Sequence, residues 1–419
     1  MKTISLDNIV VNNNRVDYYF SPSNELKKYF NNYHMFLEFN HNLDDVPNSI
    51  LAIPFVSNVI PLVWITNSTL LIDELDQSFL NCLDNVRVAY QRMFINTDFM
   101  GEIKVRENID NTYTPQREAA SLFSGGLDAL TTFVRIQDKK PILITEYGWH
   151  DEEITSSEVW EADKQNALGF AKEHNLENIL IQSNYGSFIN AKKIDRDYYE
   201  ILGDSWWHGL HHGLAIISAA IPMAYKFKVE NLYIASSNSP LYKVPCASDP
   251  TVDNEIKYGS GKVFHDGYEL SRQDKVKIVS DFYTDRQPRS IRVCFKNEEN
   301  CCKCEKCLRT IMGLIAEGKD PRDFGFSLPI NISPFLRKNL DEEVKFFTET
   351  FITIYWDLIK ERMIENRGNV LFKEILEWFQ RYDFRKQRKI SLLKYRLRNF
   401  FPIVKRKVNN KIKTIFISE

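Results

Sequence analysis

The segment Ser124-Gly125-Gly126-Leu127-Asp128 combines residue types that can hold phosphate. It follows an apolar run, Ala119 to Phe123, that predicts a strand, and the pattern from Leu127 onward predicts a helix. A strand that turns through two glycines into a helix leaves backbone amides pointing outward at the positive end of the helix dipole. Glycine also lets an anion approach the backbone closely. The segment therefore predicts a phosphate-binding turn, with Asp128 placed where a cation can be held.

Five of the seven cysteines lie between Cys294 and Cys307. Short C-x-x-C turns let two thiolates reach one metal ion, and four thiolates form a closed tetrahedral zinc site. This spacing selects Cys294, Cys301, Cys304 and Cys307 as ligands and leaves out Cys302. An iron–sulfur cluster is the alternative, because C-x-x-C-x-x-C also suits clusters. Clustered cysteines favour a reducing compartment, so we expect a cytoplasmic protein with a structural zinc ion.

Three histidines, His208, His211 and His212, follow one another at helical spacing. Such a group could form a metal site or a proton-transfer site. The alternative is a polar helix face, or histidines that are hydrogen-bonded inside the core. The neighbouring Trp206 and Trp207 are expected to pack in the core.

The turn at Ser124 resembles the SGGxDS loop of the PP-loop ATP pyrophosphatases, enzymes that cleave ATP between its α and β phosphates. The resemblance implies that Ser124, Gly125, Gly126 and Leu127 surround the pyrophosphate and that Asp128 serves the magnesium ion or the turn. The last position of the motif departs from the family, because Ala129 stands where Ser or Thr is usual. Thr131 or Thr132 is expected to supply the hydroxyl instead.

Further segments resemble one branch of these enzymes, the 7-cyano-7-deazaguanine synthase family. Ile144 to Glu153 resembles its strand-end segment, an aromatic–glycine pair (here Tyr147-Gly148) followed by His and Glu. The resemblance places Tyr147 and Gly148 in the nucleotide site.

A second segment of that family reads Thr-Lys-x-Glu, and its basic residue contacts phosphate. Here Arg272 takes the basic place and Asp274 the acidic one, with Lys275 next to it, so Arg272 and Lys275 join Asp128 as expected catalytic residues. The cysteine cluster followed by Leu308-Arg309-Thr310 resembles the family's zinc knuckle. The resemblance covers Ser121 to Gly318. The segment His265-Asp266-Gly267-Tyr268-Glu269 also resembles a motif of a broader group of bacterial proteins.

The resemblance implies an ATP-dependent enzyme that adenylates a carboxylate or amide of a small molecule, so that ammonia or another nucleophile can displace AMP. It implies ATP, Mg²⁺ and structural Zn²⁺ as cofactors. The acceptor stays open, because Trp206 to Gly213 replaces the family's Arg-Asn pair, and Ser236 to Pro240 replaces its acid-rich stretch. The alternatives are an RNA- or nucleoside-modifying enzyme and a non-catalytic nucleotide-binding module.

Alternating strands and helices after Glu118 predict an α/β fold with a parallel sheet and helices on both faces. The resemblance to the PP-loop enzymes implies that this sheet is five-stranded. We expect a strand-rich domain over 1–112, the ATP-binding domain over 113–330 and a helical region over 331–419. Strands are expected at Ile9–Val11, Val16–Phe20 and Met35–Phe39, then at Ala119–Phe123, Pro141–Glu146, Asn178–Ile181 and Asn231–Ala235. Helices are expected at Leu80–Phe94, from Leu127, at Ser156–His174, Trp207–Phe227, Glu342–Met363 and Val370–Phe379.

The 419 residues carry a formal net charge of −2, and 43% hydrophobic residues exclude a disordered chain. We expect neither a signal peptide at Met1–Val16 nor a membrane span in the apolar run Ile50–Ile65.

The chain from Arg381 is basic, and an apolar stripe at helical spacing is formed by Val404, Val408, Ile412 and Ile415 or Phe416. This tail would contact RNA or an anionic membrane surface, or stay solvated. Whether the chain forms a homodimer is left open.

Overall fold

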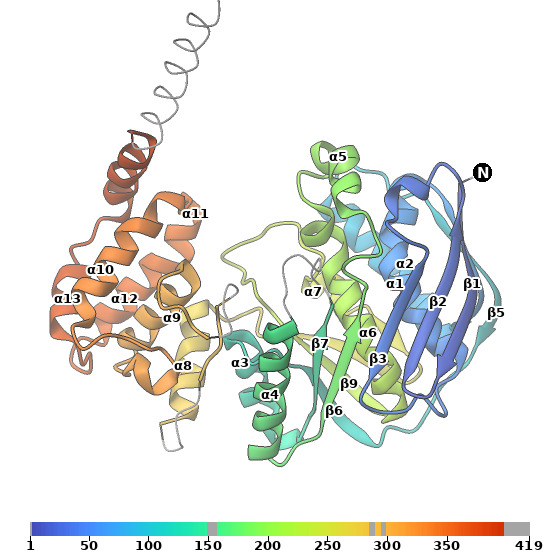
Figure 1. Ribbon diagram of the computed structural model, residues 1–419, viewed down its shortest axis with the longest axis horizontal. Coiled ribbons are helices and arrows are strands. Elements are labelled where there is room, and N and C mark those ends of the chain that lie inside the picture. The colour runs from blue at the N-terminus through green and yellow to red at the C-terminus, as the bar shows by residue number, and fades with distance from the viewer. Residues whose placement is uncertain (1, 149–156, 285–289, 295–298, 398–419) are drawn as a thin grey trace, which may run out of the picture. The chain divides into compact units, whose positions relative to one another are not determined.

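The computed structural model describes residues 2–148, 157–284, 290–294 and 299–397, shown in Figure 1. The chain forms two compact units, Met1–Glu269 and Leu270–Glu419. The predicted divisions at 112/113 and 330/331 remain predictions about independently folding domains.

One sheet of eleven strands runs through the first unit, in the order β10-β11-β9-β6-β7-β8-β3-β2-β1-β4-β5. Its strands are β1 (Thr3–Asn12), β2 (Arg15–Pro22), β3 (His34–Phe39), β4 (Thr69–Asp76), β5 (Glu102–Ile109), β6 (Arg117–Leu122), β7 (Ile142–Tyr147), β8 (Asn178–Ser183), β9 (Val229–Ala235), β10 (Lys257–Tyr258) and β11 (Gly261–Asp266).

The α/β class is confirmed, but the prediction of a parallel five-stranded sheet is wrong, because the sheet is mixed and more than twice as wide. The strands β11, β9, β6, β7 and β8 are parallel to one another. They are continued by β3, which pairs antiparallel with β8 through Leu37↔Ser183 and Phe39↔Ile181. A bare β8 edge would expose unpaired amides and carbonyls, and the N-terminal strands satisfy them. The strand β11 was not predicted, because its exposed Lys262 and Phe264 obscure the apolar alternation.

Helices cover both faces of the parallel strands. In β6, Ala120 and Leu122 join the large core that contains α6, whereas Ala119 packs with Ile136 of α3. The helices of the unit are α1 (Asn48–Thr66), α2 (Gln77–Met93), α3 (Leu127–Ile136), α4 (Ser157–Glu173), α5 (Ala191–Leu202), α6 (His212–Lys226) and α7 (Pro250–Asp253), with a π-helical turn at Trp206–His211 before α6.

The helix α1 is the centre of this core, although the sequence predicted no helix there. It is long and apolar enough to cross a membrane, but 94% of its apolar window is buried inside the protein. It continues through Pro54 and Pro61, each of which lacks the amide that an interior helix residue donates. The side-chain Nδ2 of Asn58 donates to the Pro54 carbonyl (2.8 Å), and the Oδ1 of the same side chain lies 2.8 Å from His211 Nε2. The buried polar group therefore ties α1 to the turn before α6.

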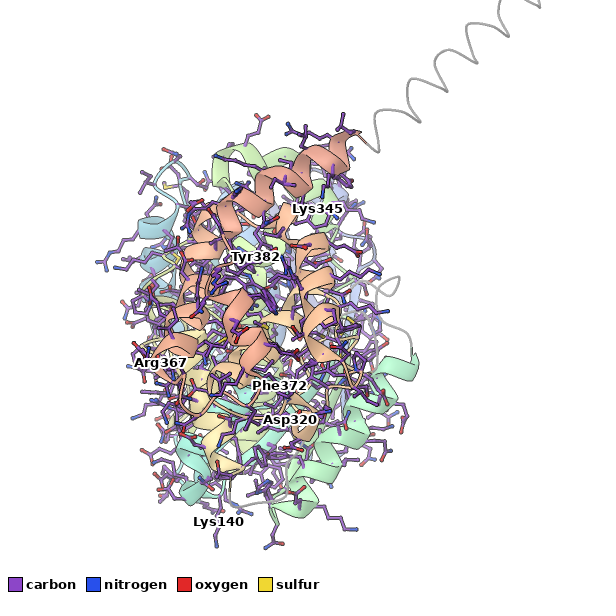
Figure 2. The ribbon with its side chains drawn as sticks, turned by 90° about the vertical axis from the view of Figure 1, so that its left-hand side faces the viewer. Lys140, Asp320, Lys345, Arg367, Phe372 and Tyr382 are labelled. Atoms are coloured by element: carbon purple, nitrogen blue, oxygen red, sulfur yellow. The ribbon has the colours of Figure 1, made fainter. Side chains whose placement is uncertain are left out.

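The second unit is helical in its described residues, as predicted for the C-terminal region. Its labelled α-helices are α8 (Arg272–Phe282), α9 (Glu305–Ala316), α10 (Ile332–Glu343), α11 (Glu349–Phe351), α12 (Leu358–Glu365) and α13 (Lys373–Phe379). The described chain is also α-helical over 384–397. The single helix predicted over Glu342–Met363 is instead broken, because α10 ends at Glu343 and a π-helical turn occupies Ile352–Asp357. Tyr382, labelled in Figure 2, donates to Asp341 of α10 (2.6 Å).

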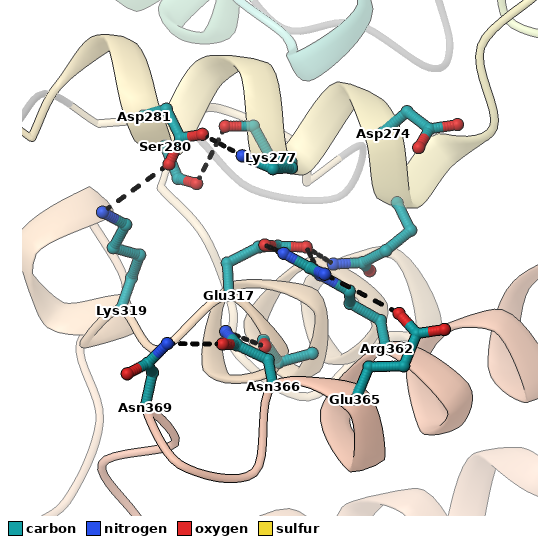
Figure 3. Close-up of polar contacts among 12 residues, drawn as sticks. Asp274, Lys277, Ser280, Asp281, Glu317, Lys319, Arg362, Glu365, Asn366 and Asn369 are labelled. Atoms are coloured by element: carbon teal, nitrogen blue, oxygen red, sulfur yellow. Dashed lines mark hydrogen bonds and ion pairs between the residues drawn. The ribbon is translucent and has the colours of Figure 1, made fainter.

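A buried carboxylate joins three helices of this unit (Figure 3). Glu317, just after α9, accepts a two-pronged pair from Arg362 of α12 at 2.8 and 2.9 Å. Gln273 of α8 donates to the same carboxylate at 2.7 Å. Arg362 also approaches the exposed Glu365 at 3.7 Å. Because the Glu317 side chain is only 3% exposed, its pairing matters far more than that of Glu365.

We predict that Glu317→Ala lowers the free energy of unfolding by about 2–4 kcal/mol, because Arg362 and Gln273 lose their acceptor. Glu365→Ala is the matched control, since it removes the other carboxylate beside Arg362, and it should cost less than about 1 kcal/mol. Urea unfolding of both variants measures the difference. Equal losses would show that Glu317 does not hold the helices together.

Candidate functional site

The turn from β6 into α3 has the geometry of an anion site. Ser124 is exposed, and Gly125 adopts a left-handed conformation with φ of +70°. A Cβ atom built on Gly125 would meet no atom of the described residues within 4 Å. Gly126 is the N-cap of α3 and provides no capping side chain. No N-cap side chain therefore accepts from the first helical turn, in which Asp128 lies, while the Gly126 amide donates to Ser124 Oγ over 3.4 Å.

A buried carboxylate fixes α3 to the sheet. Asp266, at the end of β11, accepts from Thr132 Oγ1 (2.9 Å) and from Arg135 Nε (3.1 Å). Arg135 also pairs with Glu269 at 2.7 Å. This arrangement gives the residues Asp266 and Glu269, noted in the sequence, a structural role in orienting the helix.

The expected replacement hydroxyl is not found near the turn. Thr131 Oγ1 donates to the Leu127 carbonyl (2.8 Å), and Thr132 Oγ1 is committed to Asp266. Both side chains are buried, as is Ala129. The expectation that Thr131 or Thr132 replaces the missing hydroxyl is therefore wrong, because both face the packed side of α3.

The turn lies where the strand order reverses. The chain runs from β6 outward to β7 and β8, and then returns to β9 on the other side of β6. The connections through α3 and α6 lie on opposite faces of the sheet. In open α/β sheets, ligands bind outside the carboxyl ends of the strands at such a reversal, here the ends of β6 and β9.

Tyr147 and Gly148 end the adjacent strand β7. The Tyr147 ring stacks on Trp160 of α4, with centroids 5.0 Å apart. Gly148 has a φ of +99°, and a Cβ atom there would lie 1.8 Å from the Ser183 carbonyl oxygen. Close packing against β8 therefore explains this glycine, and a nucleotide contact of either residue stays a prediction. His150 and Glu153 of the same segment lie outside the described residues.

A functional candidate that the sequence did not reveal is Glu146, beside Tyr147. Its Oε2 accepts from the Tyr185 hydroxyl (2.9 Å), and its buried Oε1 has no hydrogen-bond partner in the part of the chain that is described. Burial raises the pKa of Glu146 to about 8. A carboxyl group that is protonated at neutral pH can donate a hydrogen bond to a ligand.

Arg272 and Lys275 belong to the second unit, whereas the Ser124 turn belongs to the first. Both lie on α8, which begins with a capping box in which Ser271 and Asp274 bond each other's backbone amides. Capping therefore explains the acidic residue of this segment. Arg272 Nη2 donates to Thr310 Oγ1 of α9 (3.3 Å), and Lys275 is buried. A phosphate contact of the two cations stays a prediction.

Four cysteine sulfurs form the candidate metal centre. The Sγ atoms of Cys294, Cys301, Cys304 and Cys307 lie within 4.8 Å of one another, so the group could hold a metal ion. A hydrogen bond from Cys307 lowers the pKa of Cys304, which favours the thiolate that a metal requires. Cys302 points elsewhere, and its thiol donates to the Asn300 carbonyl (3.3 Å). The set agrees with the four ligands predicted from spacing.

The Asn300 side chain holds the two arms of this centre together. Its Oδ1 accepts from the Val293 amide (3.1 Å), and its Nδ2 donates to the Ile291 carbonyl (2.8 Å) and the Gly325 carbonyl (3.2 Å). The arm that carries Cys294 is thereby fastened beside the turn that carries Cys301. Such outer contacts orient the ligands of a metal centre.

The three histidines before α6 have different surroundings. His211 is buried against Asn58, and burial lowers its pKa to about 3. His208 is exposed and bonds Asp204 through Nδ1 (2.5 Å). His212 bonds the Trp207 carbonyl through Nδ1 (2.9 Å), and its Nε2 lies 3.9 Å from Cys246 Sγ. Burial lowers the pKa of His212 and raises that of Cys246 to about 12.

Comparison of the chain with protein-family models, with curated proteins and with solved structures found no match. The helical stripe from Val404 to Phe416 lies outside the described residues. In the described part of the basic region, Arg385 is paired with Glu349 and Asp357.

We predict that Cys304→Ala lowers the zinc content of the purified protein by about one ion per chain, because a four-thiolate site loses one ligand. Cys302→Ala is the control, since that residue neighbours the ligands but lies outside the set, and it should keep the metal. Elemental analysis measures both. Equal loss in the two variants would contradict the assignment, and strong visible absorption would indicate an iron–sulfur cluster instead.

We predict that Glu146→Gln stabilises the first unit increasingly as the pH rises from about 4.3 to about 8. Over this range the unfolded chain ionises Glu146 while the folded chain keeps it protonated, so the wild type loses stability as the pH rises. Glutamine cannot ionise, and the gain at pH 7 should reach up to about 3 kcal/mol. Thermal unfolding between pH 4 and pH 8 tests this, with the exposed Glu200→Gln as control. A difference that does not vary with pH would disprove it.

Proposed function

We propose that this protein binds ATP at the turn between β6 and α3 and adenylates a carboxylate or amide of a small molecule, releasing pyrophosphate. The observation that carries the proposal is the junction itself: Gly125 is left-handed, the helix starts at Gly126 without a side-chain cap, and no described atom lies within 4 Å of where a Gly125 Cβ would be. Phosphate groups bind to such helix starts because the amides and the helix dipole both favour negative charge.

The surroundings of the turn support a nucleotide rather than a lone phosphate. The turn lies at the reversal of strand order, where open α/β sheets bind ligands along the carboxyl ends of the strands. Asp128 lies in the first turn of α3, where its carboxylate would hold the Mg²⁺ that accompanies the phosphates. A nucleotide with a bound metal ion would use both features.

The proposed reaction has two steps, in which pyrophosphate and then AMP are the leaving groups. A carboxylate oxygen of the acceptor would attack the α-phosphorus of ATP, forming an acyl adenylate and expelling pyrophosphate. Ammonia or another nucleophile would then displace AMP. Positioning and charge neutralisation would supply the catalysis. The family resemblance assigns the pyrophosphate charge to Arg272 and Lys275.

The metal centre, the cellular compartment and the class of acceptor complete the proposed function. The four-cysteine centre would hold zinc in a closed site, without an open position for chemistry. All seven cysteines lie in the described part of the chain and are free thiols, which suits a reducing cytoplasm. The acceptor is a small-molecule acid or amide.

Product analysis tests the function. Purified protein incubated with labelled ATP, Mg²⁺ and a metabolite extract should release AMP and pyrophosphate. ADP and phosphate would overturn the adenylation. ATP binding without any product would identify the non-catalytic nucleotide-binding module, in line with the missing hydroxyl at Ala129.

We predict that Gly125→Ala weakens ATP binding at least about tenfold, because the added methyl group enters the space before the turn and shifts the strained backbone. Gly203→Ala is a matched control. Gly203 ends α5 with a φ of +69° and also has open space where Cβ would lie.

Both variants should lose about 1 kcal/mol of unfolding free energy from the same backbone strain. Calorimetric titration with a non-hydrolysable ATP analogue separates binding from stability. If Gly125→Ala binds as tightly as Gly203→Ala, the turn is not the phosphate site.

A further inference from the structure

Two histidines, His208 and His212, lie where the π-helical turn passes into α6. The π-helical turn Trp206–His211 directs His211 inward to Asn58, while His208 and His212 lie next to each other. Their rings are nearly parallel, with centroids 6.0 Å apart and an interplanar angle of 24°. Two histidines one turn apart on one helix face are a common pair of metal ligands. π-helical turns also occur frequently at functional sites.

Both rings are oriented through Nδ1. His208 Nδ1 bonds Asp204 Oδ2 (2.5 Å), and His212 Nδ1 bonds the Trp207 carbonyl (2.9 Å). Since these acceptors take the Nδ1 proton, Nε2 of each ring keeps its lone pair. Histidines that bind metals are oriented in this way, by a carboxylate or a backbone carbonyl on the other ring nitrogen.

A cysteine completes the group from a distant part of the chain. Cys246 Sγ lies 3.9 Å from His212 Nε2. Zinc bonded to one sulfur and one nitrogen at a tetrahedral angle separates those atoms by about 3.6 Å. The two ligands would therefore move little on binding.

Backbone packing fixes this cysteine in place. The Ala247 amide donates to the His208 carbonyl (2.8 Å). A Cβ atom on Gly213 would lie 2.2 Å from the Ala247 carbonyl oxygen, so only glycine allows this contact. The segment after Cys246 is thus fastened to the start of α6.

The charges around the group favour a cation. Asp253, Asp249 and Asp204 all act electrostatically on Cys246, and Asp253 and Asp204 also act on His212. Asp253 is buried, and its Oδ1 has no hydrogen-bond partner among the residues that the structure describes. An anion would be repelled from this place, whereas a metal ion would be attracted.

We propose that His208, His212 and Cys246 form a second metal site, separate from the four-cysteine centre, which takes zinc or a similar transition metal ion through two Nε2 atoms and one Sγ atom. To reach the other two ligands, the His208 ring would turn away from its present bond to Asp204, which its 46% exposed side chain allows. Three protein ligands leave the fourth position of a tetrahedral ion open to water or to a ligand group. Since α6 follows β8 and precedes β9, this position lies at the carboxyl edge of the parallel strands.

Metal counting on the full chain without nucleotide tests the site. Wild-type protein equilibrated with zinc and freed of excess should hold about two ions per chain. His208→Ala and Cys246→Ala should each hold about one fewer. His34→Ala is the control, because His34 is also a partly exposed histidine paired with an aspartate, Asp17 at 2.7 Å. It should keep the wild-type content.

Cobalt substitution gives an independent readout. In the Cys304→Ala background, Co²⁺ at the second site should show a thiolate charge-transfer band that Cys246→Ala removes. His208 is exposed, so His208→Ala should fold even where a buried substitution does not. Unchanged metal content in His208→Ala and Cys246→Ala would overturn the proposal, and so would a wild-type protein whose only metal is lost on Cys304→Ala.

Discussion

The candidate nucleotide site depends on one backbone conformation, the left-handed Gly125 at the junction of β6 and α3. It helps turn the chain from the central strand β6 into α3 within four residues, so that the strand's carboxyl end and the helix's positive end meet. The buried pairing of Asp266 with Thr132 and Arg135 then fixes the direction of the helix. Without that anchor the amides would have no defined orientation, and an anion site needs one.

The N-terminal half of the first unit supports this edge. Pairing of β3 with β8 makes the sheet continuous, and α1 lies in the core beneath α6. The bond between Asn58 and His211 links α1 to the π-helical turn before α6. The two proposed ligand sites are therefore both built on the parallel strands, one at the start of α3 and the other at the start of α6. The strand-rich N-terminal region therefore supports the proposed site at the start of α6.

Features that depend on residues close together in the sequence were predicted correctly. The glycines before Leu127 predicted the turn, and the cysteine spacing predicted the four clustered sulfurs. What depends on distant partners was not predictable. Cys246 reaches His212 only because Gly213 admits the Ala247 carbonyl, and the state of Glu146 depends on burial beside Tyr185. The helix α1 was obscured by its two prolines, which an interior position tolerates when tertiary packing stabilises the helix.

The two metal sites would differ in what they can do. Four thiolates close the coordination sphere of the first, which leaves it a structural part of the second unit. Two histidines and one thiolate would leave the second open, at the edge of the sheet that also carries the proposed phosphate-binding turn. Adenylation joins two anions, an acceptor carboxylate and the α-phosphate, and their repulsion opposes the reaction. A cation with a free coordination position would hold the carboxylate and offset that repulsion. The acidic surroundings of Cys246 would then serve to retain the metal ion, while the metal ion provides the positive charge that the acceptor needs.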